Sequence, residues 1–478
     1  MNWSMLMTFL AVLVVTDPAR APGGESSLRI ALFQVDATPP LGSPLCEGAV
    51  QPAHRIEDPL SCRGIVFLSG ARPIVVCALD WVGIGNAGHD AWRAALAEAA
   101  GTSPERVAVH CLHQHDAPGY DLSAEELMAG RDLPGKGFDP AFGKAVIDRA
   151  ARALQAAIPA AQPVTHLGAG KAEVKQVASN RRVLGGDGRV RHVRWSSMPD
   201  PKVRAAPEGI IDPMVRVVSL WNGDRAVAVL SYYATHPQSY YGKGGVSCDF
   251  VGLARRLREQ ALPGVFLVHF NGAAGNVTAG KYNDGSPPNR PALAHRLADG
   301  MAAALADSAA HKTPITAGDL AWHIRPVALP VSPRLAEDEL ARAFASRPRF
   351  GLARDLAWMR LRRQGRTIDL AELQLGPARI LHLPGELFVE YQLFAQRLRP
   401  DLFVAMAAYG DYGPGYIGTR LAYTQGGYET GPPSRVAPEV EEVLAAALRD
   451  LLEANDRAAD EPSRITATAP RLEGPAGP

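Results

Sequence analysis

Three histidines lie within six residues of the stretch VAVHCLHQHD, which spans Val107 to Asp116. His113 and His115 are separated by one residue, and side chains at positions i and i+2 of a strand end point to the same side. Neutral imidazoles placed in this way can bind a metal ion, or can divide into one metal ligand and one acid or base. Asp116 follows directly and could orient one of the two rings. A polar surface loop could have the same composition, so this stretch alone leaves both interpretations open.

Two more segments place a reactive side chain just past an apolar run. In YYATHPQS, residues 232–239, His236 lies in the loop after the predicted strand AVAVLSYY. In FLVHFNGAAGNVTAGKYNDG, residues 266–285, Thr278 lies in a turn rich in glycine and asparagine. Its hydroxyl could act as a nucleophile or contact a substrate, but a turn threonine more often bonds the backbone. A single histidine is usually structural too, so His236 gains weight only beside the pair formed by His113 and His115.

The last two segments supply a carboxylate and several phenols. In ILHLPGELFVEYQLF, Glu386 follows Pro384 and Gly385 at a predicted strand-to-helix turn, where its carboxylate could bind a metal or cap the helix. Residues 409–431 then carry five tyrosines in a glycine-rich stretch. Phenols donate hydrogen bonds and, rarely, bind metals. Five tyrosines in such a loop are more than packing requires.

Short apolar runs alternate with amphipathic helices from about residue 28 onward. We expect strands over 64–68 and 73–80, paired through a turn, and over 106–112, near 215, near 226 and over 266–270. We expect helices over 90–101, 142–158 and 437–455, others starting at 249 and 291, and two arginine-rich ones between 332 and 365. The order of elements is mixed rather than strictly alternating. The pattern therefore predicts an α/β fold in which mixed β-sheets are layered with helices in one large domain, residues 28–455.

Charge and cysteine content exclude several classes of protein. Lysine and arginine total 50 against 49 aspartates and glutamates, which argues against general nucleic-acid binding because that function usually needs a basic stripe. The five cysteines form no CxxC pair and no zinc-finger spacing. Cys77 and Cys111 lie in apolar runs, as small buried residues do. Cys46 and Cys62 could pair across a loop, but their spacing does not decide this.

The two ends of the chain differ in composition from the rest. Residues 1–24 contain an apolar core from Met5 to Val15 that is too short to span a bilayer, followed by an Ala-Arg-Ala triplet. This segment predicts a signal peptide and export to the periplasm or the outside, although no lysine or arginine precedes the core. An uncleaved anchor or a cytoplasmic protein is the alternative. Residues 456–478 have the composition of a disordered tail.

The five segments together resemble the catalytic domain of the neutral, non-lysosomal ceramidases. The corresponding blocks are HQHDAPGYD, THPQS, GNVTAG, LPGELF and GYIGTRLAYTQGGYE, in the family's order. QVDATPPLG (34–42) and ASNRR (178–182) resemble two further blocks of the family, so the resemblance covers about 30–455. Single blocks are weak signals, but five in the same order are specific. Because the chain ends soon after its last predicted helix, we expect no counterpart of the family's C-terminal immunoglobulin-like domain.

The resemblance implies a Zn²⁺ site and a catalytic constellation. The implied metal ligands are His113, His236, Glu386 and Tyr416. A tyrosine ligand is unusual, because a free phenol has a pKa of about 10 and needs the cation nearby. His115 would be the acid or base, and Arg181 and Tyr428 would hold the substrate carbonyl or the oxyanion. Thr278 stands where the family has a serine, so attack by its hydroxyl or by water both remain open, and Asp116, Asp249 and Asn276 are expected to order the ligands through hydrogen bonds.

The implied activity is zinc-dependent hydrolysis of a linear amide bond in a small amphipathic or lipid-like substrate, with contact to a membrane surface and no nucleic-acid partner. Esters or amides other than sphingolipids are alternative substrates. A non-catalytic lipid- or glycan-binding protein of the cell envelope on the same fold is the alternative of a different class. HQHD also occurs in metallo-β-lactamase-type enzymes and HxH in barrel amidohydrolases. A metallo-β-lactamase-type site needs a further Asp-His pair just after HxH, and this chain has Ala117 and Pro118 there. A barrel amidohydrolase usually has HxH in its first strand, whereas over a hundred residues precede it here, so both are minor alternatives.

Overall fold

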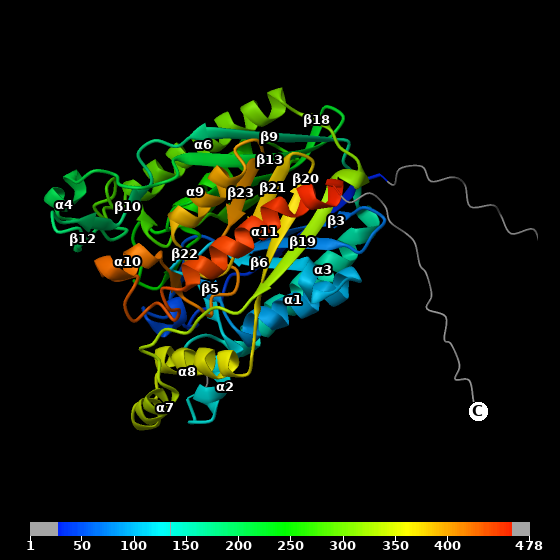
Figure 1. The fold of residues 1–478 in the computed structure, drawn as a ribbon. Coiled ribbons are helices and arrows are strands. Elements are labelled where there is room, and N and C mark those ends of the chain that lie inside the picture. Colours follow the sequence, from blue (N-terminus) through cyan, green and yellow to red (C-terminus); the bar gives the residue numbers. More distant parts are fainter. Residues whose placement is uncertain (1–26, 134, 461–478) are drawn as a thin grey trace, which may run out of the picture.

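The computed structural model describes residues 27–133 and 135–460, and its strands form three large mixed sheets (Figure 1). The predicted signal peptide, and the predicted tail beyond residue 460, lie outside the described residues. No helix among the described residues has both the length and the apolar character needed to span a bilayer. The predicted α/β class with mixed sheets is confirmed. The described strands form open sheets in linear order, so the barrel amidohydrolase alternative is wrong.

The first sheet has the strand order β6-β4-β3-β1-β8 and is covered by two helices that pack on each other. Its elements are β1 (Arg29–Asp36), β3 (Ser61–Leu68), β4 (Ile74–Leu79), β6 (Val107–Cys111), β8 (Gln162–Pro163), α1 (Ala87–Ala100) and α3 (Pro140–Ala157). The expected pairing of residues 64–68 with 73–80 is confirmed as the antiparallel β3–β4 hairpin. Helix α3 forms because Pro140 fits its first turn and Asp139 caps it by accepting from the Phe142 N–H. Its buried face carries Val146 and Leu154, and each such buried side chain contributes about 1.5–3 kcal/mol.

The second and third sheets share one hydrophobic core, because their buried residues form a single cluster. The second, β16-β14-β13-β9-β18, comprises β9 (His166–Glu173), β13 (Met214–Asn222), β14 (Arg225–Tyr233), β16 (Phe266–Asn271) and β18 (Thr313–Pro314), with helices α5 (Asp249–Ala261) and α6 (Asn289–Ala310) on it. The third, β19-β20-β21-β23, comprises β19 (Leu320–Val327), β20 (Ile368–Leu375), β21 (Ala378–His382) and β23 (Phe403–Ala407), with α9 (Val389–Leu398) and α11 (Val440–Asp460) on it. Helix α11 ends five residues later than expected, so it includes the first residues of the predicted tail. Arg457, Ala458 and Ala459 are good helix formers, which explains the continuation past Asn455.

Short paired strands and small helices complete the described chain. The pairs are β2 (Arg55–Ile56) with β15 (Gly245–Val246), β5 (Gly83–Ile84) with β7 (Gly119–Tyr120), β10 (Ser179–Asn180) with β17 (Val277–Thr278), β11 (Arg182–Leu184) with β12 (Val190–Val193), and β22 (Glu386–Leu387) with β24 (Tyr416–Ile417). The helices are α2 (Leu122–Ala129), α4 (Pro201–Ala205), α7 (Glu337–Ser346), α8 (Phe350–Arg363) and α10 (Arg420–Gln425). The suggested pair of Cys46 and Cys62 is absent: all five cysteines are free, and the sulfur of Cys62 lies 3.3 Å from that of Cys77.

Each large sheet contains one parallel strand pair, and the three pairs pack against one another. They are β4–β6 in the first sheet, β14–β16 in the second and β21–β23 in the third. Contacts join β16 to β4, β6 and β23, and β14 to β23. The loops after β6, β14 and β21 therefore leave the sheets close together at the centre of the molecule, which is where the predicted ligands lie.

Candidate metal centre

Three of the predicted ligands lie in the segments that follow β6, β14 and β21, and their side chains converge on one point. His113 comes just after β6, His236 just after β14, and Glu386 lies in β22 after β21. One ligand atom from each lies within 4.8 Å of the other two, and all three side chains are buried. This is the only such His, Cys, Asp or Glu group found among the described residues. Residues more than a hundred positions apart are thus brought together by the packing of the parallel pairs.

Backbone carbonyls fix both imidazoles so that Nε2 faces the centre. Nδ1 of His113 lies 2.5 Å from the Val82 carbonyl, and Nδ1 of His236 lies 2.6 Å from the Ala274 carbonyl. A carbonyl only accepts, so each Nδ1 carries the proton and each neutral ring presents the Nε2 lone pair. His113 adopts a positive φ of 74°, a costly conformation for a residue with a Cβ. Its N–H donates to the Trp81 carbonyl, so the end of β4 holds the residue in place.

The carboxylate of Glu386 faces both Nε2 atoms. Its Oε2 lies 3.2 Å from Nε2 of His113 and 3.0 Å from Nε2 of His236. Nε2 of His113 is buried and has no hydrogen-bond partner in the described chain. Three lone-pair donors around one point, one of them charged and none able to donate a proton, fit a bound cation.

Tyr416 is the fourth predicted ligand and lies beside the other three. It pairs with Glu386 across the β22–β24 ladder, and its hydroxyl oxygen lies 3.3 Å from Nε2 of His236. Burial raises the pKa of Tyr416 well above its usual value, whereas Arg181 acts in the opposite direction. Nη1 of Arg181 donates to the phenol oxygen at 3.1 Å, and the guanidinium also pairs with Glu429 at 3.1 Å. The fold thus brings together all four predicted ligands, with a cation beside the phenol.

His115 and Tyr428 line the more open side of this cluster. The His115 ring is half-buried, 4.7 Å from His113 between centroids, and its Nδ1 lies 3.1 Å from the His113 carbonyl. Burial, then the neighbouring His113 and His236, hold the pKa of His115 well below its usual value. Tyr428 is 41% exposed and packs edge-on against Tyr416 at 5.6 Å. Tyr428, and to a smaller extent His115, therefore connect the predicted ligands to the solvent-exposed surface.

Thr278 lies on the side of His236 that faces away from Glu386. Its hydroxyl donates to the Arg194 carbonyl at 3.1 Å and accepts from the Gly280 N–H at 3.2 Å. Val277, the preceding residue, accepts from Nδ1 of His236, which is the ring nitrogen that faces away from Glu386. No hydrogen bond within the described chain joins Thr278 to the metal-ligand cluster. The structure therefore gives its predicted role as nucleophile no geometric support.

Asp116 does not orient a histidine, which corrects the expectation from its position. Its Oδ1 accepts from the Gly242 N–H at 2.8 Å, and its carbonyl accepts from the Ser247 N–H. The chain turns after His115, so the Asp116 side chain points to the loop that follows His236 instead. Burial, which outweighs the hydrogen bond from Gly242, raises the pKa of Asp116 to about 6. Asp116 therefore anchors a loop at the edge of the site.

Asp249 and Asn276 hold the loops that carry the ligands. Both oxygens of Asp249 accept from the Ser239 N–H at 3.1 and 3.0 Å, in the loop that begins with His236. The Asn276 side chain accepts from the Val389 N–H at 2.9 Å, just after Glu386. Its carbonyl also accepts from the Arg181 N–H. These contacts order the site through the backbone and do not touch the ligand atoms directly.

Two tyrosines that were not singled out from the sequence contact the ligands directly. The Tyr412 hydroxyl donates to Oε1 of Glu386 at 2.7 Å, while Oε2 faces the two histidines. Tyr409 stacks on the His113 ring with centroids 4.7 Å apart. Both belong to the tyrosine-rich stretch 409–431, whose composition marks a site but does not say which phenol faces which ligand. Only the three-dimensional arrangement assigns these contacts.

Replacing Tyr412 with phenylalanine is expected to weaken metal binding by about 10–100-fold, the usual cost of losing a hydrogen bond to a metal ligand. The variant keeps the ring that packs against Gly83 and Arg354, and loses the bond to Oε1 together with the hydrogen bond between the hydroxyl and Arg354. Competition with a chromophoric chelator measures the Zn²⁺ affinity. Tyr423→Phe, which removes a hydroxyl bonded to Ser434 instead, is the matched control and should bind Zn²⁺ like the unaltered chain. Equal affinities for Tyr412→Phe and the unaltered chain would show that Tyr412 does not position Glu386.

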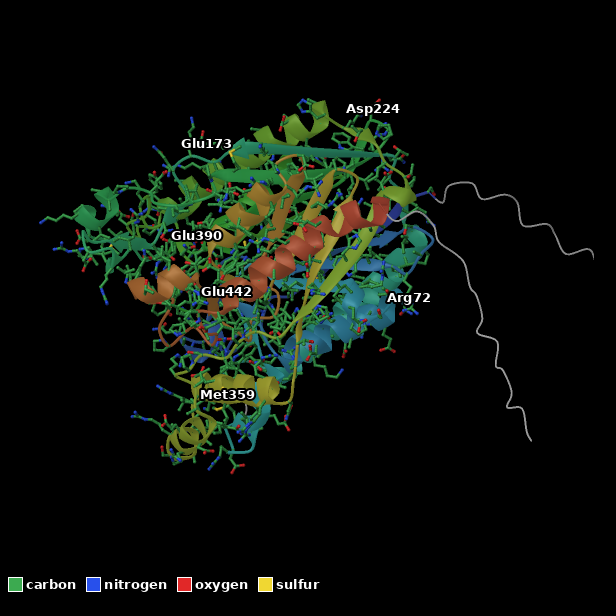
Figure 2. The ribbon with its side chains drawn as sticks, viewed as in Figure 1. Arg72, Glu173, Asp224, Met359, Glu390 and Glu442 are labelled. Carbon is green, nitrogen blue, oxygen red and sulfur yellow. The ribbon has the colours of Figure 1, made fainter. Side chains whose placement is uncertain are left out.

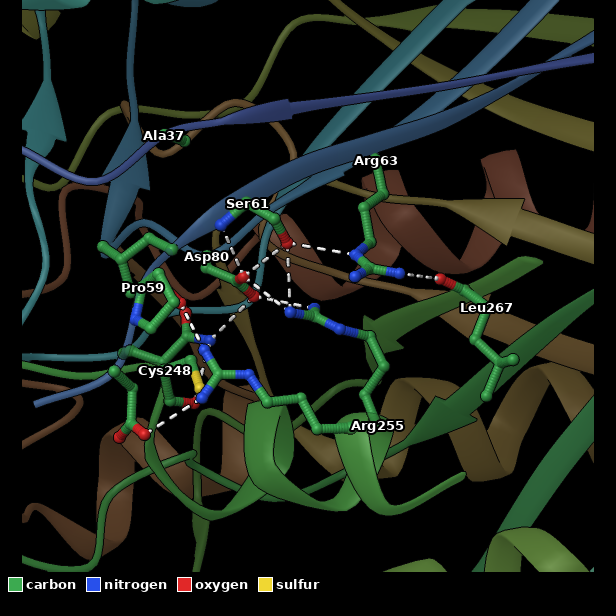
Figure 3. A network of polar contacts seen from close by, with 12 residues as sticks. Ala37, Pro59, Ser61, Arg63, Asp80, Cys248, Arg255 and Leu267 are labelled. Atoms are coloured by element: carbon green, nitrogen blue, oxygen red, sulfur yellow. Dashed lines mark hydrogen bonds and ion pairs between the residues drawn. The ribbon is translucent and has the colours of Figure 1, made fainter. Parts of the chain in front are cut away.

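A buried ion-pair network centred on Asp80 and Arg255 (Figure 3) is hydrogen-bonded to the loop that carries His113 and His115. Asp80, just after β4, receives two bonds from Arg255 on α5 at 2.8 and 2.7 Å, and two more from Ser61 at 2.8 Å each. Gln114, the residue between His113 and His115, donates to Asp80 at 3.2 Å and to the Cys248 carbonyl at 3.3 Å. The histidine loop is therefore fixed at two places. Asp80 accepts from Gln114, and the carbonyls of Trp81 and Val82 accept from His113. Sequence reasoning missed this network because its members are isolated in the chain.

Solved structures match nearly the whole chain. The neutral ceramidase from Pseudomonas aeruginosa matches with a TM-score of 0.67 at 18% identity, over 94% of this chain and 77% of that one. A structure described as a ceramidase complexed with C2 matches with a TM-score of 0.65 at 17% identity, over 93% and 77% of the two chains. No protein-family model matches, and no curated protein sequence matches significantly. The resemblance predicted from the five sequence blocks is confirmed in the fold: this chain folds as the neutral ceramidases do.

Proposed function

We propose that this protein is a Zn²⁺-dependent amidase that cleaves the N-acyl bond of a lipid-like amide. The observation that carries the proposal is the convergence of His113, His236 and Glu386, each presenting a lone pair to one buried point. Two imidazole nitrogens, a carboxylate and the phenol of Tyr416 form a donor set that suits Zn²⁺. A zinc ion held there acts as a Lewis acid toward a carbonyl and makes water a better nucleophile at neutral pH.

The remaining residues of the site supply positioning and charge. Arg181 is buried between Tyr416, Glu429 and the Tyr428 ring, whose centroid lies 5.4 Å from the guanidinium. A fixed cation beside the ligands stabilises the negative charge that develops on an amide oxygen during attack. Tyr428 can donate a hydrogen bond to the same oxygen. The Thr278 hydroxyl is hydrogen-bonded to the backbone, which favours water over Thr278 as the attacking group.

His115 is proposed to carry a proton between the attacking water and the leaving amine. Its Nδ1 faces the His113 carbonyl, so the neutral ring has a lone pair on Nε2. His115→Ala is expected to lower kcat for an amide by about 10²–10⁴-fold, the usual contribution of a general acid or base. Bound Zn²⁺ should stay at the level of the unaltered chain, because His115 is not one of the ligands. Loss of the metal in this variant, or unchanged kcat, would contradict the assignment.

The substrate class rests on the fold. The Pseudomonas aeruginosa protein is named a neutral ceramidase, and ceramide is an N-acyl amide of a sphingoid base. The test is a panel of short- and long-chain N-acyl sphingosines, simple N-acyl amines and esters, each assayed with and without chelator. Hydrolysis of an amide that stops with chelator and in Glu386→Ala, but persists in the exposed control Glu98→Gln, supports the proposal. Binding of these lipids without turnover of any of them would favour the non-catalytic alternative.

A further inference from the structure

Three large aliphatic side chains are exposed along one groove at an end of the molecule. Leu184, Ile210 and Leu421 are 46%, 54% and 64% exposed, and all three line a groove of about 520 Å³. In Figure 1 the neighbouring elements α4, β12 and α10 lie together at the left end of the view. Exposed apolar side chains gathered in this way mark a binding surface rather than ordinary surface residues. We call these three residues the aliphatic rim.

Positive charge accompanies the aliphatic rim. Residues 181–210 contain seven arginines and lysines but three acidic residues, in a chain whose opposite charges nearly balance. Arg189, Arg191 and Lys202 are exposed, and their side chains form no ion pair within the described chain. We call them the basic flank. Two carboxylates also border the groove: Glu390, labelled in Figure 2, accepts from the Asn276 side chain, and Glu441 accepts from the Arg420 N–H.

The aliphatic rim is next to the candidate metal centre. Arg194 lines the groove, and the following residue, Trp195, is 44% exposed. Trp195 packs edge-on against Tyr428 with ring centroids 5.0 Å apart, and Tyr428 packs in the same way against Tyr416. Arg182, which also lines the groove, pairs with Glu429, the same carboxylate that pairs with Arg181. Groove and metal centre therefore share the wall formed by these residues.

We propose that the aliphatic rim and the basic flank dock on an anionic lipid bilayer and turn the exposed Trp195 and Tyr428, beside the metal centre, toward it. Aliphatic side chains enter the boundary of the acyl chains, tryptophan and tyrosine favour the headgroup level, and arginine and lysine meet the phosphates. This inference deepens the proposed function, because a bilayer is where a lipid-like amide is found. Free anionic lipid headgroups would satisfy the basic flank but would leave the aliphatic rim in water.

Sedimentation with vesicles that contain no substrate tests the docking. Full-length protein is mixed with phosphatidylcholine vesicles, or with vesicles containing a third phosphatidylglycerol. Binding is expected to be at least tenfold tighter to the anionic vesicles and to weaken with salt. The triple variant Leu184→Ser/Ile210→Ser/Leu421→Ser should lose most of the binding to anionic vesicles. In the triple variant Arg189→Gln/Arg191→Gln/Lys202→Gln, the loss of each cation should weaken vesicle binding about fivefold.

Controls separate this surface from a general effect. Leu41→Ser removes an equally exposed leucine outside the groove, and Arg72→Gln removes an exposed cation that lies at the opposite end of the view in Figure 2. Both should bind like the unaltered chain, and thermal melting confirms that every variant is folded. Equal binding of the groove variants and the unaltered chain would overturn the proposal, as would failure of the unaltered chain to bind. A dimer that dissociates in the aliphatic variant would show that a second copy covers the groove, which also overturns it.

A soluble substrate distinguishes the failure of this proposal from the failure of the proposed function. Hydrolysis of a water-soluble, short-chain N-acyl amine should be the same in the groove variants as in the unaltered chain, because the metal centre is intact. Hydrolysis without vesicle binding would refute the docking surface alone. Vesicle binding without hydrolysis of any amide would refute the amidase and leave the docking surface standing.

Discussion

Replacing His236 with alanine is expected to remove the bound metal and to lower kcat/KM for an amide by about three orders of magnitude or more. Metal-ion catalysis contributes several kcal/mol of transition-state stabilisation, and each 1.36 kcal/mol is tenfold in rate. His236 is central to the cluster, because its Nε2 lies 3.0 Å from Glu386 and 3.3 Å from the Tyr416 oxygen. Metal analysis of the purified variant and its steady-state kinetics measure the two effects.

The control for this variant is a histidine outside the cluster. His295 is exposed on α6, so His295→Ala should keep both metal and activity. His113→Ala should behave like His236→Ala, because its Nε2 faces the same carboxylate. Full metal content in either ligand variant would mean that the cluster is a polar core without a cation.

Replacing Arg255 with methionine is expected to lower the free energy of unfolding by about 3–5 kcal/mol, the usual cost of breaking one partner from a buried ion pair. Asp80 and Arg255 are both almost fully buried, so Asp80 would keep its charge without its partner. Denaturant unfolding measures the difference. Lys144→Ala, which breaks the exposed pair with Asp148, is the control and should cost about 1 kcal/mol or less. A loss of similar size in both variants would show that the Asp80 network is not a support of the fold.

The effect of Arg255→Met should depend on pH in a defined direction. Burial alone would raise the pKa of Asp80, but Arg255 and Ser61 lower it to about 2 from an ordinary value of 3.8. In the unaltered chain this pair therefore adds stability that is complete above pH 3.8 and is lost as pH falls toward 2. Without Arg255, burial raises the pKa of Asp80, so the loss in the free energy of unfolding is largest at neutral pH, where the carboxyl is charged. The stability gap between the two chains should narrow from pH 7.5 to pH 5.

The sequence predicted the fold class because strands and helices leave local signals, and it pointed to the residues that converge at the candidate metal centre. Apolar runs marked β4, β6, β14 and β16 but not β23, and reactive residues just past β6, β14 and β21 marked the site. His113, His236 and Glu386 could be proposed together only through the order of the five blocks, since no spacing rule joins them. The histidine pattern alone also suggested two other enzyme classes, and the open sheets and the ceramidase-like fold exclude them.

The contacts that depend on side-chain direction could not be predicted. Asp116 follows the histidine pair directly, yet the chain turns and its carboxylate binds Gly242. Thr278 aligns with a family serine, yet its hydroxyl bonds the Arg194 carbonyl. Tyr412 was one of five similar tyrosines, and only packing shows that it is the one bonded to Glu386. Such details depend on where a turn points each side chain, which a residue's position in the sequence does not reveal.

Zinc titration of metal-free protein against amide hydrolysis tests the central claim most directly. The claim is that His113, His236, Glu386 and Tyr416 hold one Zn²⁺ that amide cleavage requires. The account predicts no hydrolysis by the metal-free chain and a rise in activity that ends at one equivalent of Zn²⁺ per chain. Full activity of the metal-free chain would contradict it, as would a chain that binds one Zn²⁺ in this site and cleaves no amide.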